Sequence, residues 1–235
     1  MDESQDARQE QQPAAEEPVG HATVTTGGRL LLVYATRHGS TREVADSVAY
    51  EFRARFAEVD VREAAEAPAP TGYDAVVVGG PMIMGWHRAA ARYVKQHRQA
   101  LADIPLALFI TAASLTEDGA SEVGGVPVAK DPWLVKAPRN ADKLRRKERY
   151  ALPRHYLSDI QKACAPARPR SVAFFAGSLD LATMNLFEKV FVLLVIGATP
   201  GDARNWKVIR GWARGLPAQL FDRPDQTSEG GATTG

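Results

Sequence analysis

Three hydroxyl side chains and one glycine lie within six consecutive residues: Thr36, Arg37, His38, Gly39, Ser40 and Thr41. They follow an unbroken apolar run, Leu30–Tyr34, and precede a segment with the apolar spacing of a helix. At such a strand-to-helix turn, the unsatisfied N–H groups and the helix dipole attract an anion, and glycine permits close backbone approach. The turn lacks the lysine of an NTP-binding loop and the three glycines of a dinucleotide fingerprint. A phosphate held by hydroxyl and amide groups is the expected ligand.

The same turn also has a simpler interpretation. Ser40 or Thr41 is a suitable N-cap residue for a helix whose apolar face begins with Val44 and Val48. The two interpretations differ in which group accepts hydrogen bonds from the N–H groups of the first helical turn. The acceptor is a side-chain cap in one interpretation and a bound anion in the other.

A second group of candidates follows an apolar run at Asp74–Gly79, and its members are Pro81, Met82, Ile83, Met84, Gly85, Trp86 and His87. Methionine and indole give polarizable contact to a planar ring, and glycine lets backbone polar groups reach the polar edge of that ring. A Met-Ile-Met triplet is also common in ordinary cores. Its position after the third predicted strand, opposite the phosphate turn, favours ring binding.

Strand and helix patterns alternate along the chain, which predicts one α/β domain with a doubly wound parallel sheet. Five strands are expected, in the order 2-1-3-4-5, at Leu30–Tyr34, Glu58–Ala64, Asp74–Gly79, Pro105–Thr111 and Ser171–Ala176. Helices are expected after the phosphate turn, at Arg88–Leu101 and at Asp202–Leu216. In this strand order a ligand binds at the carboxyl ends of the first and third strands.

Both ends of the chain have compositions typical of disorder. The first twenty residues carry six acids and one arginine, and the chain ends in TSEGGATTG. We therefore expect an acidic tail at 1–28, one domain at 29–222 and a second tail at 223–235, with no signal peptide. The formal net charge of +1 indicates no nucleic-acid partner. A single cysteine, Cys164, excludes an intrachain disulfide and favours a reducing cytoplasm; no metal site is expected.

These motifs occur together in a known family. The sequence segments that show the resemblance are ATRHGSTREVA, YDAVVVGGPMIMGWHRAAARYVKQHRQAL, and FFAGSLD followed by LFEKVFVLLVIGATPGDARNWKVIRGWARGL. From Arg29 to Leu216 the chain resembles the flavodoxin-like family, in the branch of the bacterial menaquinone-dependent protoporphyrinogen oxidase. The resemblance implies FMN, with its phosphate at the first turn and its isoalloxazine held by the second turn and by a third, Ala112, Ala113 and Ser114.

The resemblance also implies an oxidoreductase that passes electrons through FMN to a quinone or similar acceptor. A soluble electron carrier without its own substrate is one alternative, and a flavin-free interaction module is another. A deazaflavin on the same scaffold is an alternative to FMN. The segment Ser178–Asn185 lacks the aromatic and basic residues expected of the oxidase's substrate-associated insertion.

Two further segments depart from a minimal domain. The excursion at 115–149 after the fourth strand is long for a compact fold and ends in the basic run KLRRKER at Lys143–Arg149. We expect this run to start a helix that continues through Tyr156–Lys162, with a docking patch for an acidic partner or anionic lipid as the alternative. The apolar segment 185–198 is too short to span a bilayer. It is expected to be buried in the fold or a homodimer, or to contact a lipid-like or quinone-like partner at the inner membrane face.

Overall fold

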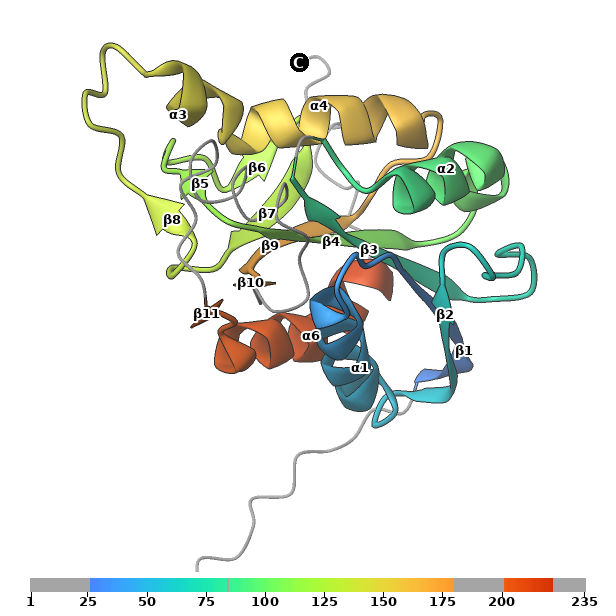
Figure 1. Ribbon diagram of the computed structural model, residues 1–235. Coiled ribbons are helices and arrows are strands. Elements are labelled where there is room, and N and C mark those ends of the chain that lie inside the picture. Colours follow the sequence, from blue (N-terminus) through green and yellow to red (C-terminus); the bar gives the residue numbers. More distant parts are fainter. Residues whose placement is uncertain (1–25, 84, 180–200, 222–235) are drawn as a thin grey trace, which may run out of the picture.

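The computed structural model describes residues 26–83, 85–179 and 201–221, and its centre is a mostly parallel sheet (Figure 1). Its seven strands run in the order β2-β1-β3-β4-β9-β7-β6. Their bounds are β1 (Thr26–Tyr34), β2 (Phe56–Glu63), β3 (Ala75–Met82), β4 (Leu106–Ala112), β6 (Glu122–Val123), β7 (Val126–Lys130) and β9 (Ser171–Ala176). Two short pairs lie outside it, made of β5 (Leu115–Thr116) with β8 (Val135–Lys136) and β10 (Ser178–Leu179) with β11 (Gly201–Asp202).

Helices cover both faces of the sheet. Figure 1 shows α1 and α6 below the strands and α2 and α4 above them. The helices are α1 (Ser40–Phe52), α2 (Arg88–His97), the 3-10 helix η1 (Ala100–Ala102), α3 (Arg146–Tyr150), α4 (Pro153–Cys164) and α6 (Trp206–Phe221). The predicted doubly wound α/β class is therefore confirmed.

The two faces explain why the central strands are apolar without a break. Along β1, Leu31 and Val33 pack into the core under α2 and α4, whereas Leu30 and Leu32 pack into the core under α1 and α6. A strand covered on both sides needs an apolar side chain at every position. Gly79 of β3 is one exception, because a Cβ there would overlap the Phe109 ring of β4.

The predicted order 2-1-3-4-5 appears as β2-β1-β3-β4-β9, all parallel, but the sheet does not end at the fifth strand. The excursion at 115–149 adds β7, parallel to β9, and β6, antiparallel to β7. Val126 and Val128 are buried on one side of β7. The prediction of five strands was wrong in number because β7 satisfies the edge of β9, whose N–H and C=O groups would otherwise lack partners.

Two helix predictions also need correction. The basic run does not continue into one helix, because α3 ends at Tyr150 and a new helix begins at Pro153. The residue before a proline is driven to extended backbone, and Leu152 has φ −70° and ψ 140°. The last helix starts at Trp206 rather than Asp202, because the side chain of Asn205 accepts from the Val208 N–H at 3.3 Å.

Several expectations concern residues outside the described ranges. These residues are 1–25 and 222–235 at the two ends, Met84, and the whole apolar segment 185–198. Within the described ranges, no helix has the length and apolar character needed to cross a bilayer.

Candidate functional site

The first turn forms the start of α1 around a left-handed glycine. Gly39 is the N-cap, with φ 86° and ψ −24°, and no side chain caps the helix. The Gly39 N–H instead donates to Thr36 Oγ1 at 3.0 Å, which closes the turn onto itself. The Ser40 and Thr41 N–H groups belong to the first helical turn and have no intrahelical acceptor. The simpler interpretation, in which Ser40 or Thr41 caps the helix, is therefore wrong.

The Thr41 side chain points into the protein rather than into the turn. Its hydroxyl lies 3.2 Å from the Thr111 hydroxyl of β4, and the two residues are 1% and 5% exposed. Thr36, His38 and Ser40 are half-buried, and Arg37 is exposed. Of the three predicted hydroxyls, those of Thr36 and Ser40 remain at the turn, and the Thr41 hydroxyl fastens it to the sheet.

The second turn is a tight return of the chain at the end of β3. The His87 N–H donates to the Pro81 carbonyl at 3.0 Å, and the Ile83 N–H donates to the Gly85 carbonyl at 3.3 Å. Gly85 makes this possible with φ 108°. The turn ends at His87, whose Nδ1 accepts from the Ala89 N–H at 3.3 Å and so caps α2.

The indole of Trp86 lies in this turn and packs against β3. A Cβ on Gly80 would lie 3.1 Å from Trp86 Nε1, so the indole rests on bare backbone of β3. Trp86 Nε1 is buried and has no hydrogen-bond partner among the described residues. A buried, unpaired N–H is costly, and a planar ligand with polar edge atoms would supply its acceptor. The residues present therefore fit a flavin-like group.

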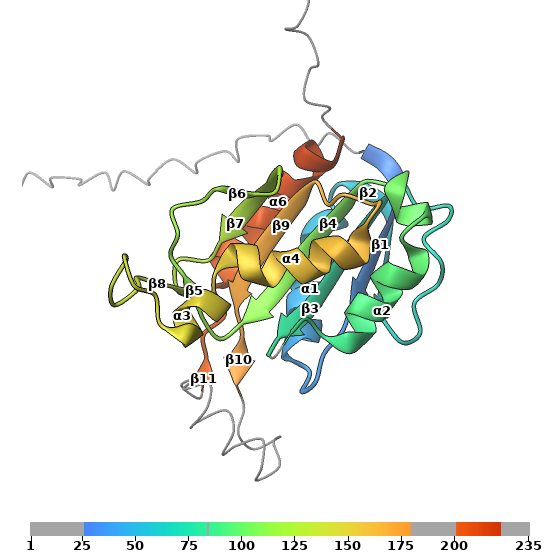
Figure 2. The ribbon, with the colours of Figure 1, turned by 90° about the horizontal axis from the view of Figure 1, so that it is seen from above.

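The third turn follows β4 and lies beside the second. Met82 and Ala112 are opposite each other in the β3–β4 register. Ala113 is exposed, and the Ser114 carbonyl accepts a 3.5 Å hydrogen bond from the Tyr156 hydroxyl of α4. Because β1, β3 and β4 are adjacent and parallel, their three carboxyl-terminal turns meet at one edge of the sheet, as Figure 2 shows. This is the edge at which such folds bind ligands.

Arg204 stabilises the first turn from a distant part of the sequence. Its guanidinium pairs with Glu43 of α1 at 2.9 Å and with Asp202 at 2.7 Å, and its side chain is only 8% exposed. It also donates to the Ser40 carbonyl at 3.4 Å and lies 4.6 Å from the centre of the Trp206 ring. Sequence reasoning missed Arg204, because no spacing rule connects residues 161 positions apart.

Asp131 joins the excursion to the same edge. It is fully buried, and its carboxylate accepts from the N–H groups of Trp133 and Ala176 and from Asn205 Nδ2, at 3.0, 3.2 and 3.3 Å. These donors come from the excursion, the end of β9 and the start of α6. In the sequence Asp131 is an ordinary loop aspartate. Its role as an acceptor that links three segments could not be predicted, because its partners come together only in the folded protein.

The electrostatics of the edge favour a neutral His87. Burial lowers the pKa of His87, and the nearby Arg37 lowers it further, while Glu63 acts weakly in the opposite direction. A neutral ring is what capping requires, since Nδ1 must keep its lone pair to accept. Across the described ranges, no three His, Cys, Asp or Glu side chains gather as metal ligands.

Comparisons with known proteins find the following similarities. The chain is 26% identical over 207 residues to the protoporphyrinogen IX dehydrogenase [quinone] of Escherichia coli K12, covering 83% of this chain and 98% of that protein. A protein of the same name from Leishmania major is 24% identical over 83% of this chain and 79% of its own length. A Fusobacterium nucleatum flavodoxin mutant bound to flavin mononucleotide aligns over 82% of this chain and 97% of its own, with 8% identity and a TM-score of 0.38.

A family model described as Flavodoxin domain matches residues 31–204, which include all three turns and Arg204. The match supports FMN as the cofactor. The chain belongs to the flavodoxin-domain family.

Proposed function

We propose that this protein is an FMN-dependent oxidoreductase that takes electrons from a reduced organic substrate and passes them to a quinone. The observation that carries the proposal is the convergence of the three turns after β1, β3 and β4 at one sheet edge. The second of these turns contains Trp86 Nε1, which has no hydrogen-bond partner among the described residues. The name of the E. coli relative, protoporphyrinogen IX dehydrogenase [quinone], supports both the acceptor and a tetrapyrrole as the reduced substrate.

Within this proposal the phosphate is bound by the first turn. The hydroxyls of Thr36 and Ser40 and the N–H groups of Ser40 and Thr41 are the donors, and the α1 dipole adds partial positive charge. Gly39 keeps the turn in the conformation that presents those groups. Arg204 balances the charge of Glu43, which would otherwise repel a phosphate from the first turn of α1.

The isoalloxazine is held by the second and third turns. Met82 and Trp86 supply apolar contact, and Trp86 Nε1 donates to a polar ring atom. The exposed Ala113 and the Ser114 backbone, fixed by Tyr156, form the other side of the site. When bound, the flavin supplies the two-electron redox chemistry. The side chains of this protein orient the ring and exclude water.

The test has two stages. The protein is purified gently, its cofactor is extracted and its mass is measured. About one FMN per chain is expected, because the described residues contain one phosphate turn of this kind. FAD, a deazaflavin or no flavin would contradict the proposal. In the second stage the flavin is chemically reduced and mixed with menadione, and turnover with protoporphyrinogen IX is then measured. Reoxidation by menadione without turnover of any reduced tetrapyrrole would identify an electron carrier instead.

A further inference from the structure

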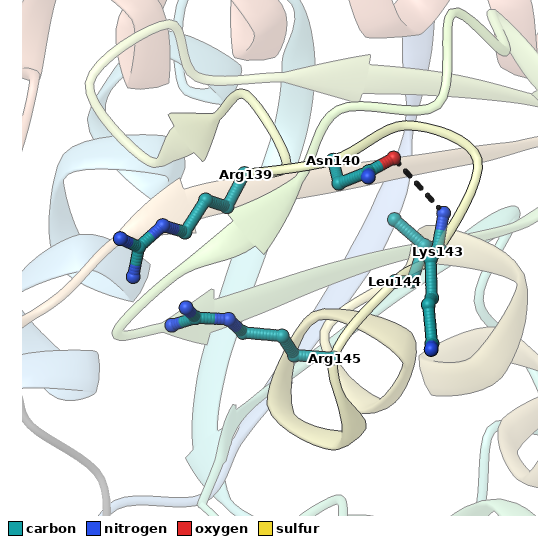
Figure 3. Close-up of a pocket in the computed structure, with 5 residues that line it drawn as sticks. All are labelled: Arg139, Asn140, Lys143, Leu144 and Arg145. Carbon is teal, nitrogen blue, oxygen red and sulfur yellow. Dashed lines mark hydrogen bonds between the residues drawn. The ribbon is translucent and has the colours of Figure 1, made fainter.

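The excursion after β4 contains a pocket of about 470 Å³ that none of the three turns contributes to (Figure 3). It lies in the loop between β8 and α3. Its lining residues are Arg139, Asn140, Lys143, Leu144 and Arg145. Figure 3 shows the side chains of Arg139 and Arg145 extending in the same direction, with their guanidinium groups facing each other.

The pocket has an excess of positive charge. Six arginines and lysines and two acids lie in the segment 139–149, RNADKLRRKER. In the described part of the chain, no carboxylate lies within 4 Å of the charged nitrogens of Arg139, Lys143 or Arg145. The two acids of the segment are Asp142, which is exposed, and Glu148. Among the described residues, none of the three cations forms a close ion pair, although the charge of Glu148 acts on Arg139 and Arg145 at longer range.

Glu148 holds the loop mainly through hydrogen bonds to its backbone, and its charge also attracts the guanidinium groups of Arg139 and Arg145. Its carboxylate accepts from the Arg139 N–H at 2.9 Å and from the Arg145 N–H at 2.7 Å. These two hydrogen bonds lower the pKa of Glu148, with smaller contributions from the charges of Arg145 and Arg139. The ionised carboxylate therefore ties the backbone at Arg139 to the backbone at Arg145.

Asn140 presents only donor atoms to a ligand. Its Oδ1 accepts from the N–H groups of Asp142 and Lys143, at 2.9 and 3.2 Å. The remaining Nδ2 group can only donate. With two guanidinium groups and one ammonium, the pocket offers donors and positive charge, together with one apolar side chain, Leu144.

The segments that flank the pocket are hydrogen-bonded to residues just after the third turn. The Thr116 N–H donates to the Ala151 carbonyl at 2.9 Å, and the Glu117 N–H donates to the Lys136 carbonyl at 3.0 Å. Both ends of the pocket loop are therefore fastened to residues that follow Ser114 by two or three positions. Figure 2 shows β5, β8 and α3 together at the side of the sheet where β4 ends.

We propose that this pocket binds the carboxylate groups of the organic substrate that reduces the flavin, an inference that rests on the proposed function. Arginine forks bind carboxylates bidentately, and the exposed side chains of Arg139 and Arg145 are accessible to such a group. Leu144 suits the apolar body of such a substrate better than it suits a bare inorganic anion. The ligand class is a di- or polycarboxylate with an apolar framework.

The test measures binding of protoporphyrin IX and of its dimethyl ester to the FMN-loaded protein by titration calorimetry. Replacing both arginines, Arg139→Gln with Arg145→Gln, is expected to weaken the binding of protoporphyrin IX about tenfold or more, because charge-assisted hydrogen bonds are lost. Affinity for the uncharged ester should be unchanged. The backbone bonds to Glu148 remain in this variant, so FMN content and Tm should match the wild type.

The matched control removes two exposed arginines at the opposite edge of the sheet, Arg98→Gln with Arg168→Gln, which precede β4 and β9. It makes the same change in net charge and should leave both affinities unaltered. The proposal would be overturned if the control variant lost as much protoporphyrin IX affinity as the pocket variant. It would also be overturned if the pocket variant lost as much affinity for the ester as for protoporphyrin IX, or if it kept the wild-type affinity for protoporphyrin IX. Arginine-dependent binding of inorganic phosphate or of anionic phospholipid vesicles in place of porphyrin would overturn it as well.

Reoxidation of the reduced flavin by menadione is measured in the same variants. If menadione fails as an acceptor while porphyrin binding still depends on the two arginines, the quinone function is wrong and the carboxylate pocket stands. If menadione reoxidises all variants equally and porphyrin binding ignores the arginines, the pocket is wrong and the quinone function stands.

Discussion

The hydroxyl oxygens of Thr41 and Thr111 lie 3.2 Å apart, although the two residues are separated by 70 positions in the sequence. One belongs to the first turn of α1, and the other is the penultimate residue of β4. Both are buried. This contact links the turn that would bind phosphate to the strand whose end would hold the flavin ring.

The Thr41–Thr111 contact is tested by a double-mutant cycle. Thr41→Val should lower the free energy of unfolding by about 1–3 kcal/mol, because the Thr111 hydroxyl is left buried without a partner. The double replacement Thr41→Val with Thr111→Val should cost less than the sum of the single replacements. Denaturant unfolding of the four proteins measures the coupling, and strictly additive losses would show that the hydroxyls do not interact.

Gly39→Val should weaken FMN binding about tenfold or more while the fold is retained. A β-branched residue disfavours φ 86°, so the turn of the FMN-free variant adopts another conformation. FMN binding must restore the original conformation, which costs about 1–3 kcal/mol of binding free energy. Gly72→Val is the matched control, since Gly72 also has φ 86° but precedes β3 at the opposite edge. It should lose comparable stability and keep FMN affinity, as followed by flavin fluorescence. Equal affinity losses in both variants would remove the phosphate assignment.

Replacing Trp86 by Phe should separate ligand binding from stability. The variant loses an unpaired buried N–H, so the FMN-free protein should be no less stable than the wild type, while FMN binds several-fold more weakly. Trp212→Phe provides the contrast, because Trp212 Nε1 donates to Ser171 Oγ at 3.1 Å and its loss should destabilise the fold by about 1–3 kcal/mol. Thermal unfolding without flavin and FMN titration give the two readouts. A Trp86→Phe variant with full FMN affinity would exclude the indole N–H as a ligand donor.

His87 makes stability sensitive to pH below 6.5. Its folded pKa is lower than 6.5, so in that window the unfolded chain binds more protons than the folded one, and the free energy of unfolding falls as pH falls. Protonation of Nδ1 also removes the α2 cap, which is worth about 1 kcal/mol. His87→Asn supplies a cap that does not titrate. The stability difference between the wild type and this variant should therefore change below pH 6.5, and a constant difference would contradict the assignment.

The central strands and the first turn could be predicted from the sequence because their signals are local. An unbroken apolar run such as Leu30–Tyr34 can be satisfied only by burial on both faces, and Gly39 between hydroxyl residues marks a strand-to-helix turn. The strand order followed from the alternation of strands and helices. The same reasoning predicted that the turns after β1 and β3 lie at the ligand-binding edge, whereas the turn after β4 was added by the family resemblance.

Tertiary structure alone decided which partners those residues meet. The direction of the Thr41 side chain, the pairing of Arg204 with Glu43 and the burial of Asp131 all depend on contacts between distant segments. Part of the excursion forms strand β7 because the edge of β9 offers backbone N–H and C=O groups for pairing, and not because of a strong local pattern. Local periodicity determines which face of an element is apolar, whereas sheet register and packing determine what lies opposite it.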